Sequence, residues 1–245
     1  MNLSSILQKE KNRSEKGGLY RQTQIKFAYN SNHIEGSRLS EEQTRYIFET
    51  NTLYVENGGT ANVNDIIETV NHFSCFDYLL EIAGEKLTGN HIKQFHALLK
   101  NATGDAKKTW FRVGEYKSRP NVVGELSTTA PENVSAEMDE LLASYHKHLV
   151  PTFEDIVDFH CRFERIHPFQ DGNGRVGRLI IFKECLAHDI MPFIIEEAHK
   201  FFYYRGLKEY PAVKGYLMDT CRAAQDNYGK MVQYFYPDLG FYEQK

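Results

Sequence analysis

The stretch HPFQDGNGRVGR at residues 167–178 constrains this chain more than any other. It follows Phe153 to Ile166, whose apolar residues recur at helical spacing and predict an amphipathic helix. Pro168 is expected to end that helix, because a proline disfavours helical geometry in the residue before it. Val176 to Ala187 is apolar enough to form a buried helix. The glycine-rich loop therefore precedes a helix N-terminus, where free N–H groups and the positive end of the helix dipole attract anions.

The polar residues of this stretch are those that a triphosphate site requires. Arg175 and Arg178 lie three apart, so on a helix both point the same way and can bind phosphate oxygens. Asp171 offers a single carboxylate beside the phosphates, which is how Mg²⁺ is commonly held. His167 stands at the start of the loop, where an imidazole can take a proton from an incoming hydroxyl. Each feature alone would be ordinary loop or surface chemistry, but together they indicate a triphosphate site with a base beside it.

The stretch resembles the signature of the Fic family, His-x-Phe-x-Asp/Glu-Gly-Asn-Gly-Arg-x-x-Arg, and the similarity extends over roughly residues 85 to 205. The usual activity of that family is transfer of AMP from ATP onto a protein hydroxyl. The resemblance implies that His167 is the catalytic base, that Asp171 holds Mg²⁺, and that Phe169 anchors the loop in the core. It assigns the ATP phosphates to Gly172, Asn173, Gly174, Arg175 and Arg178.

One position of the signature bears on the transferred group. Relatives that phosphorylate a target carry a lysine where this chain has Gly174, so the glycine favours adenylyl transfer. Relatives that transfer phosphocholine keep much of the loop, and that donor stays open.

An upstream motif is similar to the inhibitory motif of Fic proteins that restrain themselves. Leu19 to Asn32 predicts a short amphipathic helix that runs into Ser31-Asn-His-Ile-Glu35-Gly36. In those relatives the glutamate pairs with the second arginine of the loop, here Arg178. Such a carboxylate would compete for the guanidinium that should hold the γ-phosphate. The resemblance therefore implies the class with an N-terminal inhibitory helix, with Ser31 and Glu35 as inhibitory residues.

Most of the remaining chain shows helical periodicity, which predicts a mainly α fold. Further helices are expected at Ser40 to Thr50, Asn62 to Ala83, Asn90 to Leu99, from Pro131 onward, at His199 to Tyr210 and at Lys214 to Tyr234. Two β-favouring runs, 111–117 and 121–124, flank Ser118-Arg-Pro120 and predict a β-hairpin. The expected fold is thus a Fic-type helical bundle with one hairpin. Its expected parts are an N-terminal segment (1–60), a catalytic core (61–210) and a C-terminal extension (211–245), within one structural domain.

Two further sets of residues are assigned through the resemblance. In the Fic family the hairpin is a flap that pairs with an extended backbone of the target, which assigns Tyr116, Val122 and Val123 to docking. Tyrosines after the loop line the adenine pocket in the family, so Tyr203 and Tyr204 are candidates, with a core position as the equal alternative.

Composition narrows the partners. A formal net charge of −4 and a pI near 6.2 argue against nucleic acid or an anionic membrane surface as the main partner. The mean hydropathy of −0.52 predicts no transmembrane helix. Residues 1–16 are too polar for a signal peptide, so we expect a cytoplasmic protein whose four cysteines are reduced. His72, His91 and His96 lack metal-ligand spacing and are expected to be structural or on the surface.

We therefore expect a protein adenylyltransferase that uses ATP and Mg²⁺ to modify a Tyr, Thr or Ser hydroxyl of a target protein, with self-modification as a further option, restrained by a Glu35–Arg178 pair. Three alternatives stay open: hydrolysis of AMP from a modified protein with Glu35 activating water, nucleotide binding without turnover, and transfer from another donor such as CDP-choline. The target, the modified residue, the signal that releases inhibition and a homo-oligomeric state are not specified by the sequence.

Overall fold

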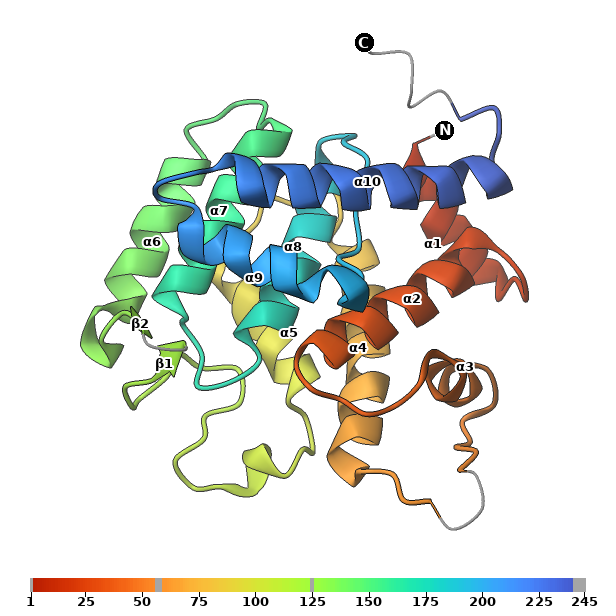
Figure 1. The fold of residues 1–245 in the computed structure, drawn as a ribbon, viewed down its shortest axis with the longest axis horizontal. Coiled ribbons are helices and arrows are strands. Elements are labelled where there is room, and N and C mark those ends of the chain that lie inside the picture. Colours follow the sequence, from red (N-terminus) through yellow and green to blue (C-terminus); the bar gives the residue numbers. More distant parts are fainter. Residues whose placement is uncertain (1, 56–58, 124–125, 240–245) are drawn as a thin grey trace.

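The computed structural model describes residues 2–55, 59–123 and 126–239, and helices account for most of them (Figure 1). The α-helices are α1 (Leu3–Arg13), α2 (Leu19–Ile34), α3 (Glu41–Thr50), α4 (Val63–Glu81), α5 (Gly89–Leu99), α6 (Val134–Tyr145), α7 (Phe153–Ile166), α8 (Asn173–Ala187), α9 (Lys200–Glu209) and α10 (Gly215–Phe235). Short 3₁₀ turns are η1 (Asp105–Lys107), η2 (Pro131–Asn133) and η3 (Glu197–His199). Strands β1 (Val122–Val123) and β2 (Leu126–Ser127) pair antiparallel.

Two helices begin at capping boxes that the sequence supplies. The Ser40 hydroxyl accepts a hydrogen bond from the Gln43 N–H, and the Gln43 side chain accepts one from the Ser40 N–H, at the start of α3. Thr152 and Asp155 make the same reciprocal pair at the start of α7. Because both ends of α7 carry local signals, this helix has the predicted bounds.

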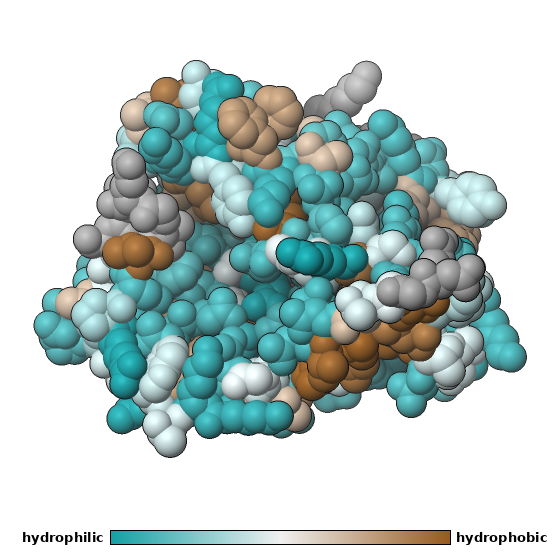
Figure 2. Space-filling model, turned by 60° about the horizontal axis from the view of Figure 1, so that its bottom comes forward, coloured by the Kyte–Doolittle hydropathy of each residue, from teal (hydrophilic) through white to brown (hydrophobic). Residues whose placement is uncertain are grey.

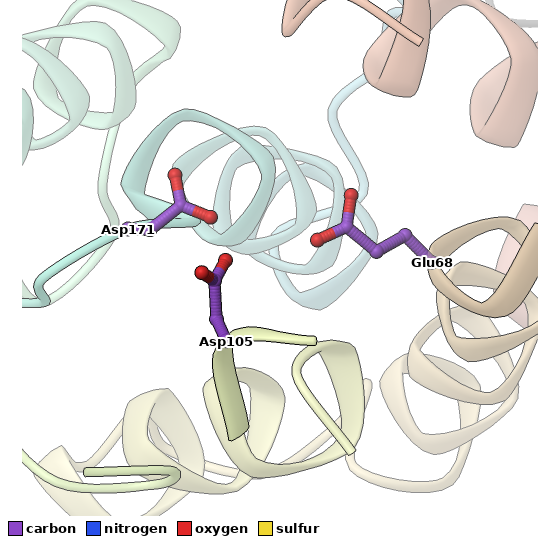
Figure 3. Close-up of side chains that lie close together, drawn as sticks. All are labelled: Glu68, Asp105 and Asp171. Carbon is purple, nitrogen blue, oxygen red and sulfur yellow. The ribbon is translucent and has the colours of Figure 1, made fainter. Parts of the chain in front are cut away.

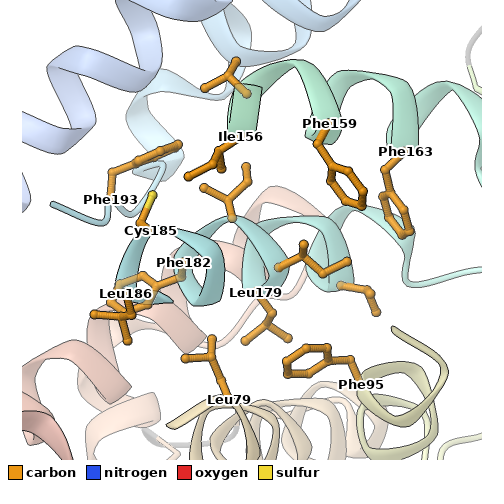
Figure 4. Packing of buried hydrophobic residues seen from close by; sticks show 14 of the residues in the cluster. Leu79, Phe95, Ile156, Phe159, Phe163, Leu179, Phe182, Cys185, Leu186 and Phe193 are labelled. Carbon is orange, nitrogen blue, oxygen red and sulfur yellow. The ribbon is translucent and has the colours of Figure 1, made fainter. Parts of the chain in front are cut away.

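Helix α8 lies at the centre of the hydrophobic core (Figures 1 and 4), and nearly all of its residues are buried. The ring of Phe182 is surrounded by aromatic rings from three other helices. Its centroid lies 5.3 Å from those of Phe27 (α2) and Phe76 (α4) and 5.4 Å from that of Tyr228 (α10). Burying one such side chain contributes roughly 1.5–3 kcal/mol. Packing on all sides therefore fixes α8, and with it the loop that enters its N-terminus.

Helix α1 has no counterpart among the predicted helices. Its core-facing apolar residues are Leu3, Ile6 and Leu7, spread over a polar segment that gives only a weak periodic signal. Tertiary contacts stabilise this helix where its local sequence pattern is weak. For example, the Glu10 carboxylate accepts a hydrogen bond from the Tyr20 N–H at 2.7 Å. The same hydrophobic core includes side chains from every α-helix except α3, whose Ile47 belongs to a second, smaller cluster, and all three predicted segments contribute to the main core.

The hairpin prediction was wrong in its position. Residues 111–117 form turns rather than a strand, and the observed strands are β1 and β2. The cause is that this run bonds elsewhere: the Gly114 N–H donates to His96 on α5 at 2.9 Å, and the Lys117 N–H donates to the Pro168 carbonyl at 2.8 Å. Gly124 lies outside the described residues.

Other expectations from composition can be compared with the structure directly. All four cysteines are buried free thiols, as predicted. Within the described ranges, no helix combines the length and apolar character needed to cross a membrane.

Candidate active site

His167 stands at the C-terminal end of α7 in a left-handed conformation, with φ of 52°. Its Nδ1 lies 3.3 Å from the Glu164 carbonyl oxygen, which can only accept, so Nδ1 carries the proton and Nε2 keeps its lone pair. Burial lowers the pKa of His167, and the nearby charge of Lys117 lowers it further. At neutral pH the imidazole is therefore uncharged, with its basic nitrogen available to take a proton.

The loop after His167 is held from inside by the Asn173 side chain. Its Oδ1 accepts the Phe169 N–H and its Nδ2 donates to the Phe169 carbonyl, each at 2.8 Å. Phe169 is fully buried and stacks on His96, with ring centroids 4.1 Å apart and an angle of 1° between the planes. The anchoring role predicted for Phe169 thus agrees with its contacts. The Asn173 side chain holds the loop together, and only its backbone N–H is left for an anion.

Helix α8 begins at Asn173, three residues earlier than predicted, with Gly172 as its N-cap. Gly172 is left-handed with φ of 83°, and a Cβ there would lie 3.3 Å from Leu99 on α5. Glycine is therefore required both by the backbone and by the close approach of α5. The N–H groups of the first turn, which have no partner within the helix, lie at the end of the loop. The end of the molecule that carries this loop is mostly hydrophilic (Figure 2).

The Arg178 guanidinium is buried and donates three hydrogen bonds to residues of α2 and its C-cap. Nε donates to the Ser31 hydroxyl at 3.0 Å, and Nη2 donates to the Ser31 carbonyl at 2.9 Å and to Oε1 of Glu35 at 2.7 Å. Glu35 is the C-cap of α2 and lies over Gly174, where an added Cβ would collide with its Oε1. A carboxylate thus occupies the anion-binding position at the start of α8.

A second carboxyl lies beneath Arg178. Oε1 of Glu164 is enclosed and has no hydrogen-bond partner among the described residues, and the same holds for Nδ1 of His160 and Nη1 of Arg178. Burial raises the pKa of Glu164 to about 8, so this carboxyl is mostly protonated at neutral pH. Glu35 is therefore the carboxylate that carries the charge opposing Arg178.

Arg175 and Asp171 belong to a second charged group on the other side of the loop. Arg175 is 4% exposed and pairs with Glu68 of α4 and, at 3.2 Å, with Asp171. Burial raises the pKa of Asp171, but the charges of Arg175 and Lys100 outweigh it and hold the pKa at about 2. Carboxylate oxygens of Glu68, Asp105 and Asp171 lie within 4.8 Å of one another (Figure 3). Half of the Asp171 side chain is exposed, which fits a role as a ligand for a divalent cation.

The residues assigned to the flap differ in solvent exposure. Val122 is an exposed side chain of β1, which also contains Val123. Tyr116 lies before the strands, half-buried, with its ring 5.7 Å from that of Phe169. Docking of a target by these residues stays a prediction.

The two tyrosines proposed for the adenine pocket have different environments. Tyr203 is 1% exposed and its hydroxyl lies 2.7 Å from Nε2 of His160, so it packs beneath Arg178 as a core residue. Tyr204 is exposed and donates to the Ile34 carbonyl at 3.3 Å, beside the end of α2. Of the two, only Tyr204 presents surface to a ligand.

Comparison with known proteins agrees with this geometry. Residues 86–184, which include the whole loop and most of α8, match the model of the Fic/DOC family. This part of the chain is a Fic domain. The chain is 24% identical to the protein adenylyltransferase Fic of Nematostella vectensis over 202 residues, which cover 80% of this chain and 46% of that protein. It is 27% identical to the protein adenylyltransferase Fic of Aedes aegypti over 187 residues, covering 75% and 36%. The chain thus spans less than half the length of these curated relatives.

Solved structures with the same fold are also Fic proteins. A Fic domain containing signaling protein from Bacteroides thetaiotaomicron superposes with a TM-score of 0.74 at 23% identity, covering 94% of each chain. Fic-1 (residues 134–508) from Caenorhabditis elegans gives a TM-score of 0.71 at 18% identity, covering 94% of this chain and 69% of that one. The predicted fold class, a mainly α Fic-type bundle, is confirmed. The flap role of the hairpin stays a prediction.

Several residues that surround the Fic loop were not identified from the sequence. Lys100, at the C-terminal end of α5, contacts Asp171, and Glu68 of α4 contacts Arg175. His96 of α5 stacks on the ring of Phe169. Lys117 is buried and its Nζ donates to the Ile166 carbonyl at 3.3 Å, next to His167. Adjacent helices bring these residues together, and their spacing in the sequence follows no motif.

Proposed function

We propose that this chain transfers AMP from ATP to a Tyr, Thr or Ser hydroxyl of a target protein. The observation that supports this best is that a base and an anion site lie at the two ends of the same loop. His167 is uncharged with Nε2 available, and the amides of the first turn of α8 together with Arg178 form the anion site. A phosphate chain bound at that helix terminus would have its reactive phosphorus beside a base. The names of the relatives, protein adenylyltransferases, favour AMP as the transferred group.

The reaction needs one proton transfer and one in-line displacement. Nε2 of His167 takes the proton of the target hydroxyl, and the hydroxyl oxygen attacks the α-phosphorus of ATP. The bond between that phosphorus and the oxygen bridging to the β-phosphate breaks, and pyrophosphate leaves. The amides at Gly172 to Gly174 and the guanidiniums of Arg175 and Arg178 neutralise the charge of the phosphates. Asp171 would hold Mg²⁺, which when bound shares that neutralisation.

We further propose that Glu35 inhibits the reaction. Its carboxylate bonds to the Arg178 guanidinium at 2.7 Å and lies over Gly174, the position where a terminal phosphate would bind. Two anions cannot share one guanidinium face without strong repulsion. ATP would therefore have to displace Glu35 before it could bind with its phosphates in the reactive arrangement.

The test is incorporation of label from α-labelled ATP with Mg²⁺ into protein, with wild type, Glu35→Gly and Glu35→Gly/His167→Ala compared in an extract of the source cells. We expect label with Glu35→Gly and neither with wild type nor with the double variant. ATP binding should persist in the double variant, because the base acts on the hydroxyl. A parallel reaction with γ-labelled ATP serves as the control and should give no label beyond that of the extract alone, whose kinases also use the γ-phosphate. Additional label from the γ-position with Glu35→Gly, or equal labelling with and without His167, would contradict adenylyl transfer by this site.

A further inference from the structure

The buried ammonium of Lys100 fills the centre of the acidic cluster. Its side chain has no exposed surface, and its Nζ lies 2.5 Å from Glu68, 3.0 Å from Asp105 and 2.7 Å from Asp171. Figure 3 shows these three carboxylates pointing toward one another from α4, η1 and the loop. A lysine is almost never fully buried unless it is paired, and this one pairs with three acids. The ammonium therefore stands where three converging carboxylates would otherwise bind a divalent cation.

The contacts of Asp171 are asymmetric. Nζ of Lys100 and Nη2 of Arg175 both donate to the same oxygen, Oδ2, at 2.7 and 3.2 Å. Oδ1 is left without a cationic partner among the described residues, on a side chain that is about half exposed. Two donors on one oxygen fix the rotation of the carboxylate and leave the other oxygen available to a ligand at the loop.

We propose that Lys100 is a positioning residue that holds Asp171 by Oδ2, directs Oδ1 toward the phosphate site, and keeps the acidic cluster from taking a divalent cation of its own. The first part rests on the proposed function, in which Asp171 holds Mg²⁺ beside ATP. The second part concerns the cluster alone and does not depend on turnover.

The charges of the cluster explain why the second part follows. Three carboxylates face the buried cations Lys100 and Arg175, and the half-exposed Lys108 pairs with Asp105 at 2.6 Å, so the charges of the group balance. Replacing Lys100 by a neutral side chain leaves one net negative charge and opens the space among the oxygens. Divalent cations bind groups of carboxylate oxygens at such sites, and their affinity follows the number of charged ligands.

The first measurement is Mn²⁺ binding without nucleotide, followed by the EPR signal of free Mn²⁺. Lys100→Met should gain one Mn²⁺ site and bind Mn²⁺ at least tenfold more tightly than any site of the wild-type protein. The matched control is Lys11→Met on α1, which removes an ammonium that also pairs with two acids, Asp77 and Glu81, far from the loop. It should bind Mn²⁺ like wild type. A folded Lys100→Met protein without the new site would overturn the second part of the proposal.

A charge-matched variant tests the first part and guards against misfolding. Lys100→Met/Asp105→Asn removes one positive and one negative charge and leaves Arg175 paired with Glu68. It should gain no Mn²⁺ site, because only two carboxylates remain. In the Glu35→Gly background it should need at least fivefold more Mg²⁺ for half-maximal transfer at saturating ATP, with little change in the maximal rate. An unchanged Mg²⁺ requirement would refute the positioning role. Absence of transfer in the Glu35→Gly parent itself would refute the proposed function, and the Mn²⁺ result would still decide the second part.

Discussion

Glu35→Gln should shift the stability of the empty protein and its affinity for ATP in opposite directions. Arg178 is 3% exposed and Glu35 is 29% exposed, with 2.7 Å between Nη2 and Oε1. At an effective dielectric constant near 20, such a pair has a Coulomb energy of about 4 kcal/mol. Solvent at Glu35 screens part of this, and Arg178 keeps both of its bonds to Ser31. We therefore expect a net loss of about 1–2 kcal/mol on removing the charge.

Each half of that prediction has its own measurement. The melting temperature of the empty Glu35→Gln protein should fall by about 2–8 °C, since 1 kcal/mol corresponds to about 2–4 °C at this chain length. ATP no longer has to displace a carboxylate, so its Kd should fall by about 5- to 30-fold. Thermal unfolding with and without ATP, and calorimetric titration, give both numbers. Glu81→Gln is the control, because its ion pair with Lys11 is on the surface. Equal ATP affinity in wild type and Glu35→Gln would refute the competition argument.

Three further predictions concern the surroundings of the loop. Lys117→Met should raise the pKa of His167, because it removes a nearby positive charge that lowers this pKa. In the Glu35→Gly background, the acid limb of the pH profile of the transfer rate should therefore move to higher pH. Glu164→Gln should become more stable relative to wild type as pH rises from about 4.5 to 8. The pKa of Glu164 is about 8 in the folded protein and about 4.5 in the unfolded chain, so wild type loses stability across this range, by at most about 1.4 kcal/mol per pH unit. Urea unfolding at several pH values measures the difference in unfolding free energy between the two proteins, and a pH-independent difference would contradict the prediction. Asn173→Ala removes two buried hydrogen bonds to Phe169 and should cost about 2–4 kcal/mol of unfolding free energy in the same assay, where a loss below 0.5 kcal/mol would show that they do not hold the loop.

The sequence was most informative where one short segment contains all the chemistry. The loop at 167–178 was predicted to be a phosphate site because its residues lie within one helix end and the turn before it, where spacing limits geometry. Ser31 and Glu35 were assigned only through the resemblance to relatives. Helix α7 was predicted with its full bounds from its apolar spacing and from Pro168, and the structure adds a capping box at its N-terminus. Pairing of Glu35 with Arg178, 143 residues apart, followed only from the resemblance to relatives and is seen as a contact in the structure.

What the sequence did not specify depends on packing between distant helices. Lys100 and Asp171 are 71 residues apart, and Glu68 and Arg175 are 107 apart, so no local pattern connects them. Strand propensity likewise misplaced the hairpin, because Lys117 bonds to Pro168 across the fold instead of to a neighbouring strand. In each case a tertiary hydrogen bond outweighs the local preference.

Inhibition and catalysis are proposed to use the same guanidinium, that of Arg178. Its contacts explain how inhibition by Glu35 can be relieved without disturbing the orientation that catalysis needs. Ser31 holds Nε and Nη2 through its hydroxyl and its carbonyl, and neither bond involves Glu35. Departure of the Glu35 carboxylate therefore removes one acceptor from a side chain that stays oriented. Gly174 has no side chain to obstruct the vacated position, and a phosphate can approach the helix terminus as closely as the carboxylate did. Under the proposed function, helix α2 and its C-cap would block Arg178 through Glu35 and keep it oriented for the phosphate through Ser31.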